Sequence, residues 1–417
     1  MNNPKYVANK PTSKNLTLVA AALSSSIFSL SAYAACSTVF QAVITIGGGP
    51  PLEICRDSIE SIYTDAIRDA GTSFPGAATA ALSSNLRLYG VGASINFSQG
   101  SNVLNFSIPE LGINNSFNGA TRADSAILLR QFLENNPDIF ANLQKRQAAV
   151  SPLSPITGTS GVLPRAIISD FNSSFNDTPT RIATSQSTAS QGSQSVLGAG
   201  VLVSMHDVAN SKVKTLSIPL SYTVRNDIDP RRQALIRGGI GVVDTAASRS
   251  YQGRLSAGYR FPMSDEWVLT PMGGLSFAAS KDAAFAVGVG NASLASTYTW
   301  EFESFDLTMG NMLGYYQTFK LPVKFSGDPK IRIAALVNGI FLSQPINIAD
   351  SKMAIEYGFS DSRLGGTELY QNNSQELTIS LGTNKSALSA RSFFRATLAA
   401  QRAKDSKGVS LGLNYWF

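Results

Sequence analysis

The chain ends in VSLGLNYWF, residues 409–417, and this stretch decides the fold. Every second residue from Val409 to Phe417 is apolar or aromatic, and the residues between them include a serine, a glycine and an asparagine. A period of two with one apolar face indicates a β-strand. The sequence therefore predicts that the chain ends in a strand with one apolar side.

The same alternation recurs through the second half of the chain. It is clear at Leu216–Val224, Tyr251–Phe261 and Leu377–Leu381, where small residues and arginines fill the opposite face. At Ile331–Phe341 we expect Ile331 and Ile333 to face outward and Arg332 to face inward. The segments with this pattern are 195–205, 213–224, 232–243, 250–261, 267–278, 293–302, 305–318, 330–341, 353–359, 375–383, 390–401 and 408–417. They predict a barrel of about 12 strands, with 10 or 14 strands left open, because single-chain bacterial barrels have even numbers.

A soluble β-sandwich would also alternate, but the aromatic residues favour a membrane barrel. They stand near the ends of the predicted strands, where interfacial girdles require them, at Tyr259, Phe261, Trp267, Trp300, Phe302, Phe341 and Tyr415. We predict an all-β transmembrane barrel over 195–417, preceded by a small mixed α/β region. With both ends periplasmic, we expect periplasmic turns at 225–232 and 262–266, and extracellular loops at 279–292 and 360–374.

The N-terminus, residues 1–34, has the pattern of a signal peptide. Three lysines precede an apolar stretch that ends in Ala32-Tyr33-Ala34, an A-x-A cleavage motif. The chain has two cysteines, Cys36 and Cys55, and an even pair in an exported chain predicts a disulfide. We therefore expect the mature chain in the outer membrane of a Gram-negative cell.

Between the signal and the barrel, residues 35–177 have the mixed pattern of a small α/β region. Residues 98–101 form a turn between two strand candidates, and Thr121 and Pro137 are placed to begin helices. A Ser/Thr/Gln-rich linker follows at 178–194. None of these patterns predicts a catalytic site.

The last strand resembles the signature that the outer-membrane barrel assembly machinery reads, with Leu413, Tyr415 and Phe417 as the signal residues. The hairpin over 254–277 resembles the corresponding hairpin of autotransporter β-domains. This resemblance implies a 12-stranded barrel, a helix threading its lumen and an exported N-terminal passenger.

The N-terminal region departs from the autotransporter pattern. It is short and has no internal repeat. The linker before the barrel is also a poor helix former. A lumenal helix would therefore have to come from 122–149 or 162–174, or the lumen holds none.

Strand parity places a set of charged residues on the inward face, because a charge facing lipid at the midplane costs about 2–4 kcal/mol. The set is Arg237, Arg254, Arg260, Arg332, Arg391, Arg395, Glu301, Glu303, Asp306 and Glu376. Three roles are open for this basic wall: a ladder of ion pairs between strands, a hold on an acidic segment of the N-terminal part, or an anion-preferring pore.

Composition excludes several classes of function. One histidine and two cysteines leave too few ligands for a zinc, iron–sulfur or bis-histidine haem protein, so we expect no metal and no cofactor. Removal of the signal lowers the formal charge from +6 to +3, which gives nucleic-acid binding no support.

Three functions remain open. The first is an outer-membrane barrel of autotransporter type that anchors or displays a short N-terminal domain. The second is a channel or plugged barrel whose N-terminal region is periplasmic or lumenal. The third is an outer-membrane hydrolase that uses His206 as its base, although we expect no enzyme. The expected partners are outer-membrane lipid, the barrel assembly machinery and a surface or host ligand of the N-terminal region.

Overall fold

The computed structural model describes most of the chain after residue 39. The described ranges are 40–56, 79–88, 91–175, 195–209, 211–226, 229, 231–245, 248–280, 285–323, 326–348, 351–383 and 393–416. The predicted signal peptide, Cys36, the whole linker at 178–194, Arg391 and Phe417 lie outside these ranges. Cys55 belongs to a described strand, and its pairing with Cys36 stays a prediction.

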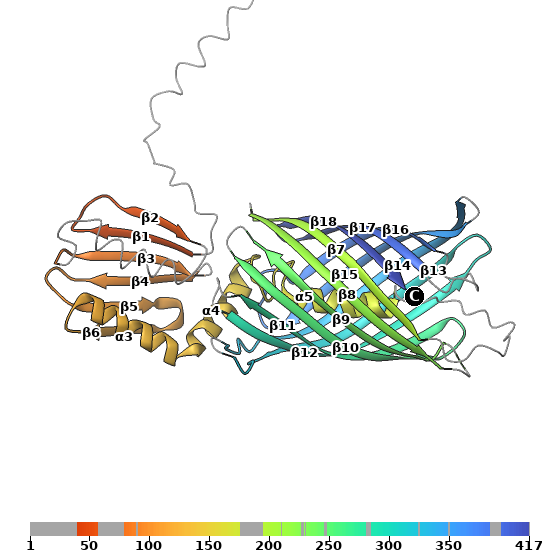
Figure 1. The fold of residues 1–417 in the computed structure, drawn as a ribbon, viewed down its shortest axis with the longest axis horizontal. Helices are drawn as coiled ribbons and strands as arrows, with labels where there is room; N and C mark the ends of the chain where they lie inside the picture. The colour runs from red at the N-terminus through yellow and green to blue at the C-terminus, as the bar shows by residue number, and fades with distance from the viewer. Residues whose placement is uncertain are drawn as a thin grey trace, which may run out of the picture. The chain divides into compact units, whose positions relative to one another are not determined.

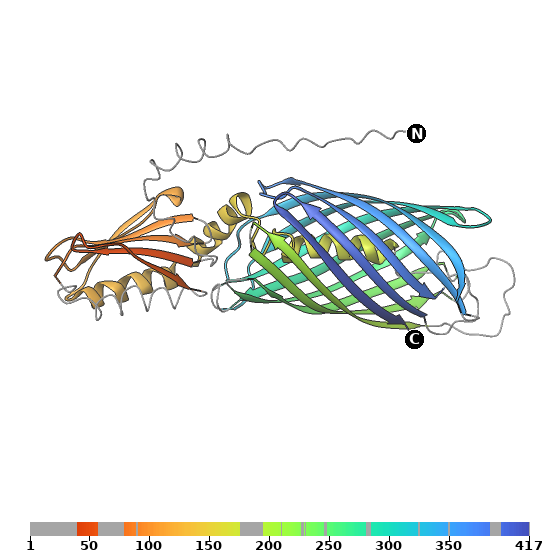
Figure 2. The same cartoon turned by 90° about the horizontal axis from the view of Figure 1, so that it is seen from above.

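The C-terminal half forms a closed barrel of twelve antiparallel strands, which confirms the predicted fold class and strand number (Figures 1 and 2). The strands are β7 (Val196–Val208), β8 (Ser211–Arg225), β9 (Gln233–Asp244), β10 (Arg249–Pro262), β11 (Trp267–Ser280), β12 (Phe285–Glu301), β13 (Asp306–Phe319), β14 (Arg332–Ile348), β15 (Ser351–Gly366), β16 (Asn373–Thr383), β17 (Phe393–Ala403) and β18 (Ser406–Trp416). β18 pairs with β7, for example Leu411 with Val203, and this pairing closes the sheet.

Two of the predicted extracellular loops are shorter than expected. β12 begins at Phe285 and β15 continues to Gly366, so the connections left are 281–284 and 367–372. A strand of 9–11 tilted residues already crosses a bilayer. The extra residues of β12, which has 17, and of β15, which has 16, therefore extend the wall of the barrel.

The outer surface of the barrel is apolar, as a lipid-facing wall requires. On β18 the outward side chains are Val409, Leu411, Leu413 and Tyr415, each about half exposed, as the alternation predicted. An outer-membrane β-barrel accounts for this surface, because a wall of half-exposed aliphatic side chains is stable in lipid and costly in water. Among the described helices, none is long and apolar enough to cross a bilayer.

β14 reverses the predicted orientation. Ile333 is fully buried on the inner face, whereas Leu336 and Ile340 are exposed on the outer face. The prediction assumed a wet lumen, in which apolar side chains must point out. Here the lumen contains a helix, so apolar side chains on the inner face have a partner.

The described parts of residues 40–150 form a six-stranded antiparallel sheet and two α-helices. The sheet order is β2-β1-β3-β4-β5-β6. Its elements are β1 (Phe40–Ile46), β2 (Leu52–Arg56), β3 (Leu82–Leu88), β4 (Val91–Phe97), β5 (Val103–Ile108), the short η2 (Pro109–Leu111), β6 (Ile113–Asn118), α3 (Arg122–Asn135) and α4 (Pro137–Val150). One face of the sheet is apolar and buried, and the ring of Phe117 lies 5.5 Å from that of Phe132 on α3.

Local signals in this region are confirmed. The predicted turn at 98–101 joins β4 to β5, where Phe97 pairs with Leu104. Thr121 caps α3 in a capping box with Asp124, and Pro137 begins α4.

Candidate functional site in the barrel lumen

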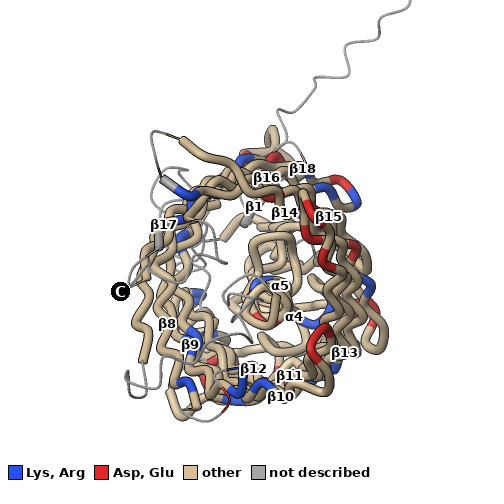
Figure 3. The backbone as a smooth tube through the Cα atoms, turned by 90° about the vertical axis from the view of Figure 1, so that its right-hand side faces the viewer, with Lys and Arg blue, Asp and Glu red and all other residues tan. Residues whose placement is uncertain are grey.

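Among the described helices, α5 (Val162–Phe175) lies inside the barrel. Figure 3 shows it within the ring of strands, and it packs against β10, β11, β12 and β13. It coincides with 162–174, one of the two segments that the sequence left open as a lumenal helix beside the alternative of an empty lumen. Apolar and polar side chains of α5 are both buried, because the barrel surrounds the helix.

The carboxylate of Asp170 joins α5 to three strands. Asp170 is fully buried and forms an ion pair with Arg254 of β10. Its other oxygen accepts hydrogen bonds from Asn291 Nδ2 of β12 and from the Tyr316 hydroxyl of β13, both at 2.8 Å. Arg254 also donates to Ser276 Oγ of β11 at 3.0 Å. A buried charge is tolerated only when it is paired and hydrogen-bonded, and these partners meet that requirement.

Arginines also hold the two ends of α5. Near its start, Arg165 donates to Gln252 Oε1 at 3.0 Å, and Gln252 donates to the Ser160 carbonyl at 3.1 Å. Near its end, Arg260 Nη2 donates to the carbonyls of Ser173 and Ser174 at 3.2 and 2.8 Å. The last carbonyls of a helix have no intrahelical partner and carry partial negative charge, so a cation stabilises them.

Aromatic rings and glycines line the contact of α5 with β13 and β14. Phe175 contacts Phe171 and Phe341, with ring centroids 5.3 and 4.1 Å apart. A side chain at Gly310 of β13 would overlap the Phe175 ring, and one at Gly339 of β14 would come within 2.8 Å of Phe171. Glycine at these two positions lets the helix approach the wall.

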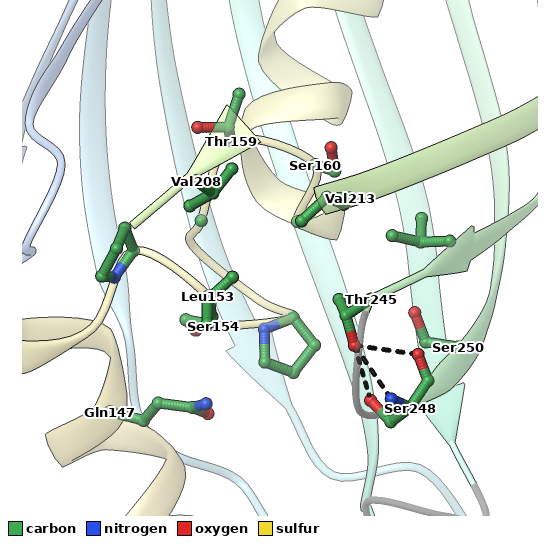
Figure 4. Close-up of a pocket in the computed structure, with 15 residues that line it drawn as sticks. Gln147, Leu153, Ser154, Thr159, Ser160, Val208, Val213, Thr245, Ser248 and Ser250 are labelled. Atoms are coloured by element: carbon green, nitrogen blue, oxygen red, sulfur yellow. Dashed lines mark hydrogen bonds between the residues drawn. The ribbon is translucent and has the colours of Figure 1, made fainter. Parts of the chain in front are cut away.

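The segment before α5 fills the end of the barrel where the β7–β8 turn lies. Leu153 packs on Val208, Val213 and Val243 near the ends of β7, β8 and β9. Figure 4 shows the space beside Leu153, a cavity of about 30 Å³. That volume holds a water molecule or two and no larger ligand.

Polar contacts complete the packing of this segment. Thr159 Oγ1 donates to Ser406 Oγ, which is 2.7 Å away. His206 Nε2 lies 3.0 Å from Gln401 Oε1, and its Nδ1 lies 3.5 Å from Ser160 Oγ. The histidine therefore lies inside the barrel between an amide and a hydroxyl. Within the described ranges, no group of three or more His, Cys, Asp or Glu side chains is placed to bind a metal ion.

The structure distributes the predicted inward charges among different environments. Arg254 and Arg260 hold α5, while Arg237 points inward from β9 and donates to Thr223 Oγ1 at 3.2 Å. Arg395 of β17 pairs with Glu356 of β15 at 3.0 Å, as a ladder between strands would. The charges therefore serve both a ladder and a hold on the N-terminal part.

The predicted acids lie nearer the ends of strands than the centre of the lumen. Glu301 and Asp306 stand opposite each other where β12 and β13 meet their turn, and Glu376 is half-buried on the inner side of β16. Two placements were wrong. Glu303 is exposed in the turn itself, and Arg332 is exposed on the outer face at the first residue of β14. Charge is tolerated there because a strand end lies away from the bilayer midplane.

Sequence reasoning missed Asp170, Asn291 and Tyr316. One signal was available for Asp170, which is the only acid in the segment VLPRAIISDFNSSF. Its partners gave no signal, since Asn291 falls in the predicted loop 279–292 and Tyr316 looks like an ordinary inward residue of its strand.

Comparison with known proteins shows the fold alone. No protein-family model and no curated protein matches the sequence. The chain is similar to the β domain of the Bordetella autotransporter Brka, with 9% identity over 54% of this chain and 98% of that one, at a TM-score of 0.42. It is similar to the translocator domain of autotransporter NalP from Neisseria meningitidis, with 11% identity over 69% and 98%, at a TM-score of 0.45. An outer membrane channel from Pseudomonas putida F1 also matches, with 11% identity over 53% and 94%, at a TM-score of 0.37. Because autotransporters and channels both match this weakly, function has to be argued from the lumen.

Proposed function

We propose that this protein is an outer-membrane barrel of autotransporter type that displays residues 40–150 at the cell surface. One observation carries the proposal. The chain passes once through the barrel as α5, and it enters at the end opposite to the barrel's own termini.

The contacts of the segment before α5 identify that end. Thr159 contacts Ser406, the first residue of β18, and Leu153 packs on Val208, the last residue of β7. Val196 and Trp416 mark the other end, since β7 begins and β18 finishes there. The chain before residue 151 therefore leaves the barrel away from its termini.

The direction of α5 agrees with this path. Arg165 near its start bonds Gln252, which follows the β9–β10 turn by a few residues. Arg260 near its end is two residues from the finish of β10, on the termini side. The helix thus returns the chain to the end where β7 starts.

The side of the membrane on which the N-terminal region lies also depends on how the barrel is oriented. An even number of strands puts both termini at one end, and short turns are the periplasmic ones. The connections at the termini end are 226–232, 263–266, 302–305, 349–350 and 384–392, and those at the other end are 209–210, 245–248, 281–284, 320–331, 367–372 and 404–405. Their lengths do not distinguish the two ends, so we take the termini as periplasmic from the resemblance of the last strand to the signal that the barrel assembly machinery reads. Periplasmic termini leave residues 40–150 outside the cell.

The alternative functions have less support. A channel would require α5 to move out of the lumen. The contacts of Asp170, Arg165 and Arg260 hold the helix there. A periplasmic N-terminal region would require the barrel to insert with its termini outward. A hydrolase would need His206 beside an accessible nucleophile, and the ring is buried between Gln401 and Ser160.

Site-specific proteolysis of intact cells tests the proposal. A protease site is inserted in the exposed turn at 98–101, and a matched control carries the same site in the turn at 263–266. External protease should cut the first variant in intact cells, and should cut the control only after the outer membrane is permeabilised. The opposite pattern would place the N-terminal region in the periplasm and overturn the proposal.

A further inference from the structure

A basic cluster lies on the outer surface of the barrel, across four neighbouring strands. It consists of Arg402 on β17, Lys407 on β18, and Lys212 and Lys214 on β8. Asp207 of β7 lies among them. All five side chains are exposed and share the outward parity of their strands.

Strand register places four of these residues in one row. Arg402 pairs with Lys407, Lys407 with Asp207, and Asp207 with Lys212. Strands lie about 4.8 Å apart, so the row spans roughly 14 Å of the barrel circumference. Arg402 and Lys407 are directly opposite each other, and like charges in that position destabilise a sheet.

Two other outward arginines of the barrel have carboxylate partners. Arg249 lies 2.6 Å from Asp244, and Arg363 lies 2.9 Å from Asp361. By contrast, none of the four cluster cations makes an ion pair or a side-chain hydrogen bond to another described residue. The one acid in the row, Asp207, cannot balance four cations.

The other acids near the cluster are already engaged. Asp405, in the β17–β18 turn, accepts a hydrogen bond from the Tyr370 hydroxyl, and its charge is balanced by the exposed Lys404 next to it in the same turn. Asp244 is opposite Lys214 in register, but it is held by Arg249. The cluster therefore has an excess of positive charge that the protein itself does not neutralise.

Apolar rows lie directly next to the cluster on the same strands. Met205 and Val409 are the nearest outward neighbours of Asp207 and Lys407, and Val203, Leu411 and Leu216 follow. Each of the five is about half exposed. The cluster thus marks the border between the hydrocarbon-facing wall and the polar rim of the barrel.

We propose that Lys212, Lys214, Arg402 and Lys407 bind the phosphate groups of a membrane lipid, whose acyl chains pack on the adjoining apolar rows. Unpaired cations beside an acyl-facing surface complement both parts of such a lipid. Phosphate binding would also offset the repulsion between Arg402 and Lys407. The site stands on the barrel alone and does not depend on which side of the membrane carries residues 40–150.

Lipid binding to the full chain in neutral detergent tests the proposal. The probes are dioleoyl phosphatidic acid and dioleoyl phosphatidylcholine, and bound lipid is counted by native mass spectrometry. The test variant carries Lys212→Gln, Lys214→Gln, Arg402→Gln and Lys407→Gln. The matched control carries Arg332→Gln and Arg363→Gln, which remove two outward cations of β14 and β15, away from the cluster.

The wild type and the control should bind phosphatidic acid in preference to phosphatidylcholine, and the test variant should bind it at least tenfold more weakly. Equal binding by the test variant would overturn the proposal. Binding of inorganic phosphate without preference for phosphatidic acid over phosphatidylcholine would show a free-anion site and overturn the lipid assignment. If the fourfold variant does not fold, the double variant Lys212→Gln/Lys407→Gln answers the same question, with a smaller loss expected.

Discussion

At the scale of single residues, Asp170 is the most consequential contact of the lumen. Its side chain is fully buried and bonds Arg254, Asn291 and Tyr316 on three different strands. Removing one partner of a buried ion pair is costly because the other charge stays buried without compensation. The carboxylate therefore fixes the position of α5 along the lumen as well as its rotation about its own axis.

Asp170→Ala should lower the free energy of unfolding by about 3–5 kcal/mol, because Arg254 is left buried and without its carboxylate. Denaturant unfolding of the purified protein in detergent measures the change. Ser169→Ala is the control, since that side chain precedes Asp170 and makes no hydrogen bond in the described structure. Wild-type stability in Asp170→Ala would show that the carboxylate does not hold the helix.

A second variant separates charge from shape. Replacing both partners, as Asp170→Leu with Arg254→Met, leaves no buried charge unpaired, and such exchanges are often neutral or stabilising. This double variant should recover most of the stability that Asp170→Ala loses. A loss as large as that of the single variant would point to a role for Arg254 beyond pairing with Asp170.

At the scale of elements, the strands were predictable and the place of the helix was not. Alternation depends on the side-chain period of two, so β8, β10, β16 and β18 follow from their own sequences. β14 was assigned the wrong face because its inward residue Ile333 is buried in a lumen that contains α5. One sequence cannot show that Asp170 meets residues 84, 121 and 146 positions away, since nothing local marks those pairs.

A substitution at Gly310 tests the packing of α5 against β13 directly. Gly310→Ala should destabilise the protein by about 1–3 kcal/mol, because its Cβ would overlap the ring of Phe175 and a packed core does not absorb the extra atom. Gly238→Ala is the matched control on another strand, since its Cβ would lie 3.7 Å from the nearest atom. Thermal unfolding in detergent reports both.

A double-mutant cycle shows whether the two side chains meet. Phe175→Ala should cost less in the Gly310→Ala background than in the wild type, because the smaller side chain gives the new methyl group room. If the losses in the free energy of unfolding from the two substitutions simply add, the helix does not contact β13 at this point.

At the scale of the whole molecule, closure is the property that everything else depends on. The seam joins β7 to β18, whose residues are about 200 positions apart in the sequence. Trp416 lies over Gly198 on the inner side of this seam, and a side chain at Gly198 would overlap its indole ring. Closure leaves no free strand edge, which satisfies every backbone group of the wall between neighbouring strands.

Closure predicts heat-modifiable migration that depends on this seam. The wild type, kept unboiled in detergent, should stay folded and migrate differently from the boiled protein, because unfolding has no edge from which to begin.

Gly198→Val should reduce the folded fraction recovered from the outer membrane, since the valine would displace Trp416 and disrupt the pairing of β7 with β18. Gly365→Val is the control, as a side chain there meets open space. Adding Trp416→Ala to Gly198→Val should restore part of the folded fraction. Equal recovery of Gly198→Val and wild type would show that the seam tolerates the overlap, and a wild type whose mobility ignores boiling would contradict the closed barrel itself.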